Sequence, residues 1–332
     1  MRIRKKYFIT NMQKSSVVIF FLFAAFFAAC STPTVSSDDS DEGPEKVEQE
    51  DKSSSSGISS SKEASWSSSS EKKTESSSSA ELSELSSNSA DDQDCSTLLK
   101  KEKEDGFWYW KVPKECRFNP DIDYGSITDS RDGQVYKTVK IGEQTWMAEN
   151  LNYADSIKTP SLLGKSWCYE DDPEKCAVAG RLYTWTAAID SVALYDGGAG
   201  VDCGYYKTCS LPDTVHGICP SGWHLPNNME WNTLLDFLGG PKLAGNDLRS
   251  LSGWYAGGNG TDSVGFSALP VGQRDGVGVF SFTASLASFW SVTDKYDGFW
   301  VYALVLGADD YYAYLSSSNA KNDGFSVRCL KD

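Results

Sequence analysis

Cysteine is the residue that most restricts what this chain can fold into. The sequence of 332 residues contains nine cysteines. An ordinary cytosolic enzyme carries fewer, so this number indicates an oxidising compartment in which disulfides persist. Eight of the nine lie after residue 94, and an even number of cysteines in an exported domain implies a disulfide framework. We therefore expect a disulfide-braced domain over residues 95–332.

The eight cysteines could pair in roughly a hundred ways, and the entropy of loop closure ranks these alternatives. Cysteines that are close in sequence close a short loop at a low entropic cost, so local pairs are favoured. The pairs expected on this basis, the last one by elimination, are Cys95–Cys116, Cys168–Cys176, Cys203–Cys209 and Cys219–Cys329. A zinc site is the alternative, but the sequence has no CxxC pair and has one histidine, His216, within the cysteine-rich stretch.

The first 29 residues are typical of a secretion signal. Five basic residues and no acidic one come before an uncharged apolar run from Val17 to Ala29. This run of 13 residues is shorter than the roughly 20 that a membrane-spanning helix needs. Ala28 and Ala29 before Cys30 resemble the lipobox of bacterial lipoproteins, in which the cysteine is acylated. We expect a lipoprotein signal peptide over 1–29 and a lipid anchor on Cys30; cleavage after Ala29 without acylation is the alternative.

Residues 30–94 have the composition of a disordered tether. Residues 31–94 contain 24 serines and carry a net charge of −11. The few apolar residues have no periodicity, so the segment cannot bury enough surface to offset the entropy of ordering it. A flexible chain of this length spans roughly 40–50 Å. The segment is therefore interpreted as a spacer between a membrane and a domain; a serine-rich ligand for a partner is the alternative.

Net charge and histidine content exclude some classes of function. The formal charge of −15 argues against a nucleic-acid-binding protein, which needs a basic face to neutralise phosphates. Most of this acidity belongs to the tether, and residues 95–332 carry −9. With two histidines in the whole chain, a histidine-rich metal centre has little support. We expect no cofactor and no metal.

Strand patterns dominate residues 95–332. Residues 135–141 alternate between apolar and polar side chains, and 145–147 follow them after a turn. Residues 299–306 and 311–315 predict a hairpin, and 325–329 predict a closing strand.

Helical patterns are fewer. Residues 229–238 keep helical apolar spacing after two asparagines that suit a helix start, and a shorter helix is expected near 182–191. Glycine-rich connections are found at 197–200, 253–265 and 272–278. The predicted fold class is α+β, loop-rich, without the strand–helix alternation of a doubly wound sheet.

Seven separated sequence blocks resemble the Fibrobacter major paralogous domain. The first, from Asp129 to Leu151, reads DSRDGQVYKTVKIGEQTWMAENL. The others follow in order: GRLYTW at 180–185, CPSGWHLP at 219–226, EW at 230–231, GFSALP at 265–270, FWS at 289–291 and SVRCLKD at 326–332. The resemblance covers about residues 124–332 and places the core of the domain there.

WHLP followed by EW is also similar to a segment of formylglycine-generating-enzyme-like domains, which share the C-type-lectin-like fold. The resemblance implies a single lectin-like domain, in which a cysteine before the first long helix pairs with one in the last strand. Cys219 and Cys329 fit that pattern. The cysteine context that the related oxidases use is absent, as are the EPN and QPD strings of calcium-dependent lectins. We therefore lean against an enzyme.

Individual polar residues offer weak evidence for a catalytic site. His224 is expected to hydrogen-bond within the fold, and Glu230 to cap the helix that it starts or to pair with a core arginine. Arg249, Arg274 and Arg328 could each hold a carboxylate inside the fold or contact a ligand. Six aspartates that could offer oxygen ligands, Asp262, Asp294, Asp297, Asp309, Asp310 and Asp323, match no calcium loop and are interpreted as turn residues.

Aromatic residues supply the remaining candidate surface. We expect Trp231 and Trp290 in the core. Flat rings close to Asp and Asn suit sugars, which stack on aromatics and hydrogen-bond through their hydroxyls. The candidate ligand-binding residues are Trp254, Tyr255, Tyr311 and Tyr312; the alternative is that they too fill the core.

Together these features predict a lipoprotein of the cell envelope, lipid-anchored in the outer membrane with the domain on the surface. The domain is expected to be monomeric, to bind or adhere without catalysis, and to have a plant polysaccharide or a surface glycan as its ligand. A structural envelope protein with protein partners is the second hypothesis. An enzyme related to the formylglycine-generating group is the third.

Overall fold

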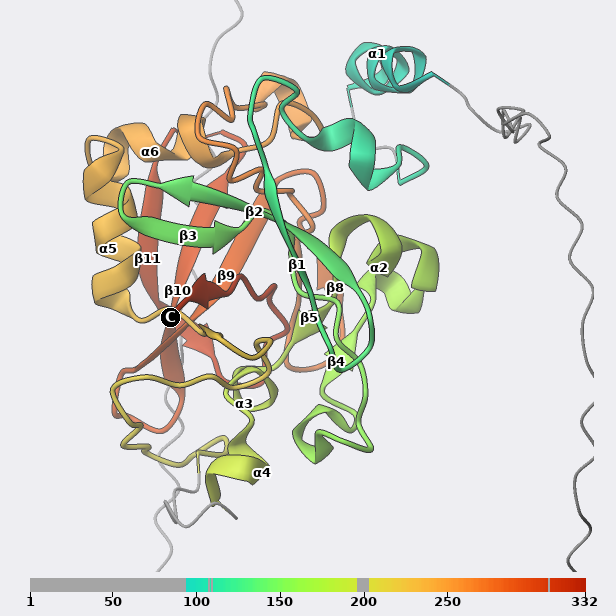
Figure 1. Cartoon of the computed structure of the whole chain (residues 1–332). Helices are drawn as coiled ribbons and strands as arrows, with labels where there is room; N and C mark the ends of the chain where they lie inside the picture. The colour runs from blue at the N-terminus through green and yellow to red at the C-terminus, as the bar shows by residue number, and fades with distance from the viewer. Residues whose placement is uncertain (1–93, 107, 109, 196–202, 310) are drawn as a thin grey trace, which may run out of the picture. The chain divides into compact units, whose positions relative to one another are not determined.

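The computed structural model describes residues 94–332 except 107, 109, 196–202 and 310. The expected signal peptide, Cys30, the tether to residue 93, the 197–200 connection and Asp310 lie outside the described residues. Helices and strands are mixed along the described chain, which confirms the expected α+β class (Figure 1). No helix among the described residues has the length and apolar character needed to cross a membrane.

The helical elements are short. The helices are α1 (Cys95–Asp105), α2 (Pro173–Ala179), α3 (Trp185–Ala188), α4 (Ser191–Leu194), α5 (Asn228–Phe237) and α6 (Pro241–Leu248). The described residues also form the 3₁₀ turns η1 (Lys114–Arg117), η2 (Pro160–Leu162), η3 (Tyr169–Asp171) and η5 (Tyr255–Gly257).

The strands form two main sheets and two small ribbons. A five-stranded antiparallel sheet has the order β1 (Gly125–Thr128), β2 (Val135–Ile141), β3 (Gln144–Met147), β12 (Leu330–Lys331) and β6 (Trp223–His224). A three-stranded antiparallel sheet has the order β11 (Ala313–Ala320), β10 (Trp300–Gly307) and β9 (Leu286–Asp294). The ribbons pair β4 (Ser166–Trp167) with β5 (Leu182–Tyr183), and β7 (Gln273–Arg274) with β8 (Phe280–Ser281).

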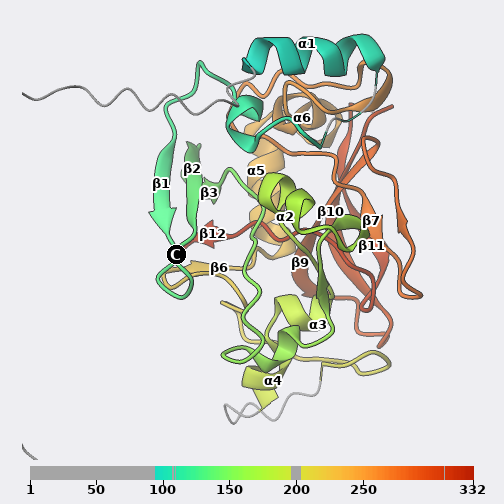
Figure 2. The same ribbon diagram turned by 90° about the vertical axis from the view of Figure 1, so that its right-hand side faces the viewer.

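Helix α5 joins the two main sheets. Asn227 accepts hydrogen bonds from the backbone N–H groups of Met229 and Glu230, while Glu230 accepts from the Asn227 N–H, so the helix starts with a capping box. Its Trp231 is fully buried and stacks on Trp146 of β3, with 4.6 Å between ring centroids. The ring centroid of Trp231 also lies 6.3 Å from that of Phe289 in β9. Figure 2 shows α5 between the two sheets. The expected helix and the buried positions of Trp231 and Trp290 are confirmed.

The hairpin at the end of the chain is confirmed, but the closing strand differs. Strand pairing in the last segment is confined to Leu330–Lys331, and Phe325 and Ser326 make isolated bridges to Tyr183 and Phe289. This segment crosses from the three-stranded sheet to the five-stranded sheet, so its backbone groups change partners along its length. A periodic sequence pattern could not show that crossing.

The helix expected near 182–191 is also corrected. Leu182 and Tyr183 are buried, and they pair with β4 in an extended ribbon instead of starting a helix. Thr184 then caps α3 through its side chain, and Asp190 has a left-handed φ of 50°, which ends that helix before α4 begins.

The disulfides have the pairing predicted from loop entropy. Cys95–Cys116, Cys168–Cys176, Cys203–Cys209 and Cys219–Cys329 are all formed. The first attaches α1 to η1, and the buried ion pair of Glu102 with Arg117, at 2.8 Å, supports the same contact. The last connects the residues before β6 to the residues before β12.

We predict that the disulfides differ in stability contribution according to the loop that they close. Cys219–Cys329 spans 110 residues and Cys203–Cys209 spans 6. Replacing both cysteines of a pair by serine should lower the unfolding free energy by about 4–5 kcal/mol for the first pair and about 2 kcal/mol for the second. Urea denaturation followed by tryptophan fluorescence measures both losses. Equal losses would contradict the chain-entropy explanation.

Candidate functional site

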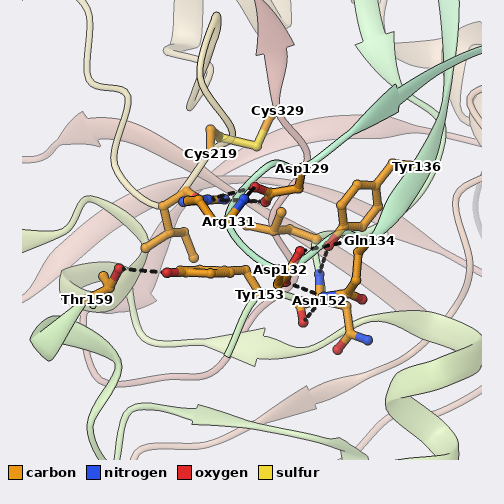
Figure 3. Close-up of polar contacts among 12 residues, drawn as sticks. Asp129, Arg131, Asp132, Gln134, Tyr136, Asn152, Tyr153, Thr159, Cys219 and Cys329 are labelled. Carbon is orange, nitrogen blue, oxygen red and sulfur yellow. Dashed lines mark hydrogen bonds and ion pairs between the residues drawn. A yellow bond between two sulfur atoms is a disulfide. The ribbon is translucent and has the colours of Figure 1, made fainter. Parts of the chain in front are cut away.

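The first signature segment forms a polar network beside the Cys219–Cys329 disulfide (Figure 3). Arg131 donates to both carboxylate oxygens of Asp129, at 2.9 and 2.6 Å, and its guanidinium lies 3.9 Å from the Tyr153 ring centre. A further hydrogen bond of 2.9 Å reaches the Ile218 carbonyl. Burial alone would raise the pKa of the Asp129 carboxyl, but the hydrogen bonds from Arg131 outweigh it and hold that pKa below its ordinary value.

The same segment turns its other polar groups inward. Tyr136 accepts a hydrogen bond from the Asn152 backbone at 3.1 Å, and Gln134 donates to Asp132 and to the Asn152 carbonyl. Burial raises the pKa of the Tyr136 phenol, which stays neutral. The polar atoms of this signature bind one another, and this arrangement stabilises the fold.

His224 lies between two carboxylates. Its Nδ1 is 2.7 Å from Asp332 and its Nε2 is 3.0 Å from Glu230, whose other carboxylate oxygen accepts from the Asn227 N–H at 2.8 Å. The hydrogen bond to Glu230 raises the pKa of His224, burial opposes the rise, and Asp332 adds to it. The ring therefore links β6 to the start of α5 and to the residue after β12. This is the expected structural role for His224, and Glu230 both caps the helix and pairs with a histidine in place of an arginine.

The three candidate arginines have different surroundings. Arg328 is fully buried and donates to the Asn150 side chain and to the carbonyls of Met147, Phe266 and Ser267. Arg249 donates to the carbonyls of Gly307 and Ala308. Arg274 lies at the edge of a cleft described below.

The candidate aspartates mostly serve turns, as expected. Asp297 accepts from the backbone N–H groups of Phe299 and Trp300, and Asp262 accepts from the backbone and hydroxyl of Ser267. Burial raises the pKa of Asp262 to about 7. Within residues 94–332 as described, no three His, Cys, Asp or Glu side chains are grouped so that they could hold a metal ion.

The predicted ligand-facing aromatics are divided by the structure. Trp254 is 4 % exposed, and its indole N–H donates to Ser250 and to the Ala268 carbonyl, so its ring offers no open face to a sugar. Tyr255, Tyr311 and Tyr312 are exposed. They lie toward one end of the domain, where the 255–258 turn packs against Ala308 at Gly258. None of these three tyrosines lines the cleft described next.

A cleft of about 710 Å³ opens beside the β4–β5 ribbon. We call it the Trp167 cleft. Its wall residues come from the η2–β4 connection, α3, α4, the 203–205 segment, β7 and the 321–322 turn. They are Gly164, Lys165, Trp167, Thr184, Thr186, Ser191, Val192, Tyr195, Cys203, Gly204, Tyr205, Arg274, Gly276, Lys321 and Asn322.

Two exposed rings, a hydroxyl and an amide give this cleft its chemistry. Tyr195 and Tyr205 are 59 % and 38 % exposed, and Tyr205 is held by edge contacts with Tyr206 and Phe299. Ser191 adds a hydroxyl and the Asn322 amide lies against Gly276, whereas the hydroxyls of Thr184 and Thr186 are buried and bond one another. Rings next to hydroxyl and amide groups match the two kinds of contact that a sugar makes.

The floor of the Trp167 cleft is rigid. Lys321 is fully buried, binds Asp294 at 2.8 Å and the Lys207 carbonyl at 2.6 Å, and lies 4.7 Å from the Trp185 ring centre. A buried ion pair with these additional contacts fixes the position of the 321–322 turn. The cleft walls therefore rest on the core.

Sequence reasoning missed this cleft. Arg274 was the one wall residue considered as a ligand contact, and Cys203 was predicted as a disulfide partner, because the residues come from segments that are up to 158 positions apart, Gly164 to Asn322. The one local indication of the cleft was a group of three tyrosines close in sequence, Tyr195, Tyr205 and Tyr206. A contact between these segments cannot be deduced from spacing.

A second cavity, of about 310 Å³, lies beside the signature network, but its charged groups are paired. Lys114 binds Glu149 at 2.8 Å, and Arg117 binds Glu102. Groups that already bind one another are poorly placed to bind a ligand. The Trp167 cleft is therefore the better candidate site.

The fold and cleft define a disulfide-braced α+β domain with an open cleft of aromatic and polar side chains. Residues 139–331, more than half of the chain, match the Fibrobacter succinogenes major domain. The chain belongs to that family, which confirms the resemblance of its sequence blocks. No curated protein and no solved structure matches the chain.

His224 makes stability depend on pH in a defined direction. Its folded pKa is raised above the unfolded value, so its contribution is fully present below about pH 6.5 and is lost as pH rises through the folded pKa. We expect the unfolding free energy to fall over that interval, and His224→Gln to reduce the fall. Urea denaturation at pH 5.5 to 9 measures both. A His224-dependent gain of stability with rising pH would contradict this assignment.

Proposed function

We propose that this chain is a cell-envelope lipoprotein whose domain binds glycans without catalysis. The single observation that carries the proposal is the Trp167 cleft, whose wall combines two exposed tyrosine rings with hydroxyl and amide side chains. A cleft of about 710 Å³ accommodates a short stretch of a polysaccharide.

The proposal includes a C-type-lectin-like arrangement of the domain. Cys219–Cys329 supports it, because this disulfide joins the segment before the long helix α5 to the end of the chain. Strand β12, next to Cys329, lies between β3 and β6. The disulfide agrees with the pairing that the sequence resemblance implied.

Binding to polysaccharides is the direct test. The purified protein should be retained on at least one of insoluble cellulose, xylan or pectin. Tyr195→Ala and Tyr205→Ala should each weaken binding by about 2- to 12-fold, since a ring contact contributes about 0.5–1.5 kcal/mol. Affinity electrophoresis and pull-down with depletion measure the change.

Tyr311→Ala is the matched control, because Tyr311 is exposed and lies outside the cleft. It should bind like the parent protein. Equal losses in all three variants would move the site away from the Trp167 cleft. A folded protein that is retained on none of these polysaccharides would argue for the alternative, a structural envelope protein with protein partners.

The anchor is a separate part of the proposal. We expect mass spectrometry of the protein isolated from membranes to find acylated Cys30 as its first residue, and Cys30→Ser to release the protein from the membrane fraction. Two or more acyl chains are needed for stable attachment. An unmodified N-terminus at Ser31 in the isolated protein would overturn the anchor and leave the binding proposal intact.

A further inference from the structure

The Trp167 cleft is cationic in an acidic domain. Among the described residues, its wall contains Lys165, Arg274 and Lys321 and neither aspartate nor glutamate. Residues 95–332 nevertheless carry −9. An anionic polymer would be repelled by most of this surface, so a local positive charge determines where it can bind.

Arg274 lines the cleft and forms no ion pair among the described residues. Its guanidinium lies 3.9 Å from the centre of the Trp167 ring, which holds the planar group by cation–π contact. Its side chain donates a long hydrogen bond, of 3.3 Å, to the Asp275 carbonyl. Its Nε is buried and has no hydrogen-bond partner among the described residues.

The nearby carboxylates are occupied by backbone groups. Asp275 accepts from the N–H groups of Val277 and Val279, and Asp323 accepts from those of Gly276 and Ala320. Neither forms an ion pair with Arg274 in the described part of the chain. Arg274 lines the cleft without an ion pair to either of these carboxylates.

Lys165 supplies a second cation that can meet a ligand, whereas Lys321 is already paired. Lys165 is exposed, and no ion pair is found for it in the part of the chain that the structure describes. Lys321 is neutralised by the buried carboxylate of Asp294. Two of the three cations of the wall can thus meet a ligand.

We propose that the Trp167 cleft binds an acidic polysaccharide, with Arg274 and Lys165 on the carboxylate of a uronic acid and Tyr195 and Tyr205 on the sugar rings. The inference rests on the proposed glycan binding and specifies its substrate class. The guanidinium fork matches the two oxygens of a planar carboxylate, and Lys165 supplies a point charge beside it. The rings and hydroxyls of the cleft distinguish such a ligand from a simple anion.

Polygalacturonate and its fully methyl-esterified form provide the test, because they share one sugar chain and differ in charge. The protein should bind polygalacturonate at least about 10-fold more tightly, and this preference should decline between 50 and 500 mM NaCl. Arg274→Gln should lower polygalacturonate affinity by about 10-fold or more, the range of a charge-assisted hydrogen bond, and leave the ester within about 2-fold. Isothermal titration measures each affinity.

Lys165→Gln is the variant that leaves the core untouched, since Lys165 is exposed. It should lower polygalacturonate affinity by about 2- to 5-fold, as expected for an exposed ion pair. Lys140→Gln is the matched control, because Lys140 is an exposed cation of β2 outside the cleft. It should change nothing. Thermal unfolding establishes that Arg274→Gln remains folded.

The outcomes separate the two proposals. Equal affinity for polygalacturonate and its ester, with both cation variants unaffected, would overturn the acidic ligand and support neutral glycan binding. Binding of dextran sulfate more tightly than polygalacturonate, with the same sensitivity to Arg274→Gln, would overturn the carboxylate. Binding to no polysaccharide by a folded protein would overturn the proposed function and this inference together.

Discussion

The segment from Gly324 to Lys331 is the contact on which the rest of the domain depends. It bridges Tyr183 and Phe289 near its start and reaches the five-stranded sheet at Leu330. Between these points, the fully buried guanidinium of Arg328 binds backbone carbonyls of β3 and of the loop at Phe266 and Ser267. Such a guanidinium costs desolvation energy that its hydrogen bonds must offset, so its neighbours are held in one arrangement. Cys219–Cys329 fixes the segment covalently at the same place.

The candidate cleft inherits its rigidity from that segment. Lys321 and Asn322 lie directly before it, and Gly324 forms a bridge with Arg274. Arg274 of the cleft wall is therefore positioned by the same backbone segment that joins the two main sheets. Glycan-binding loops benefit from such support, because a preorganised site loses less entropy when a flexible polymer binds. The same segment therefore contributes both to the stability of the fold and to the geometry of the cleft.

Sequence reasoning succeeded where interactions are local and failed where they are not. The disulfides follow from loop length, and α5 follows from Asn227, Glu230 and the spacing of its apolar residues. The break at Asp190 depends on a left-handed backbone that no pattern announces. Helix α6 begins at Pro241 directly after the two glycines that end α5, and these glycines concealed it. Most of the cleft wall was missed because it is assembled from segments that meet only in the folded chain.

Net charge, finally, says little about what an acidic domain can bind. Many of its carboxylates are bound to backbone N–H groups in their own turns: Asp155 accepts from Ile157 and Lys158, and Asp297 accepts from Phe299 and Trp300. These interactions hold the pKa values of both aspartates below their ordinary range. These aspartates thus help to form the loops of a loop-rich fold, and they keep their negative charge. A small excess of positive charge in one concave place is then enough to give the domain a cationic site, although the whole chain carries −15.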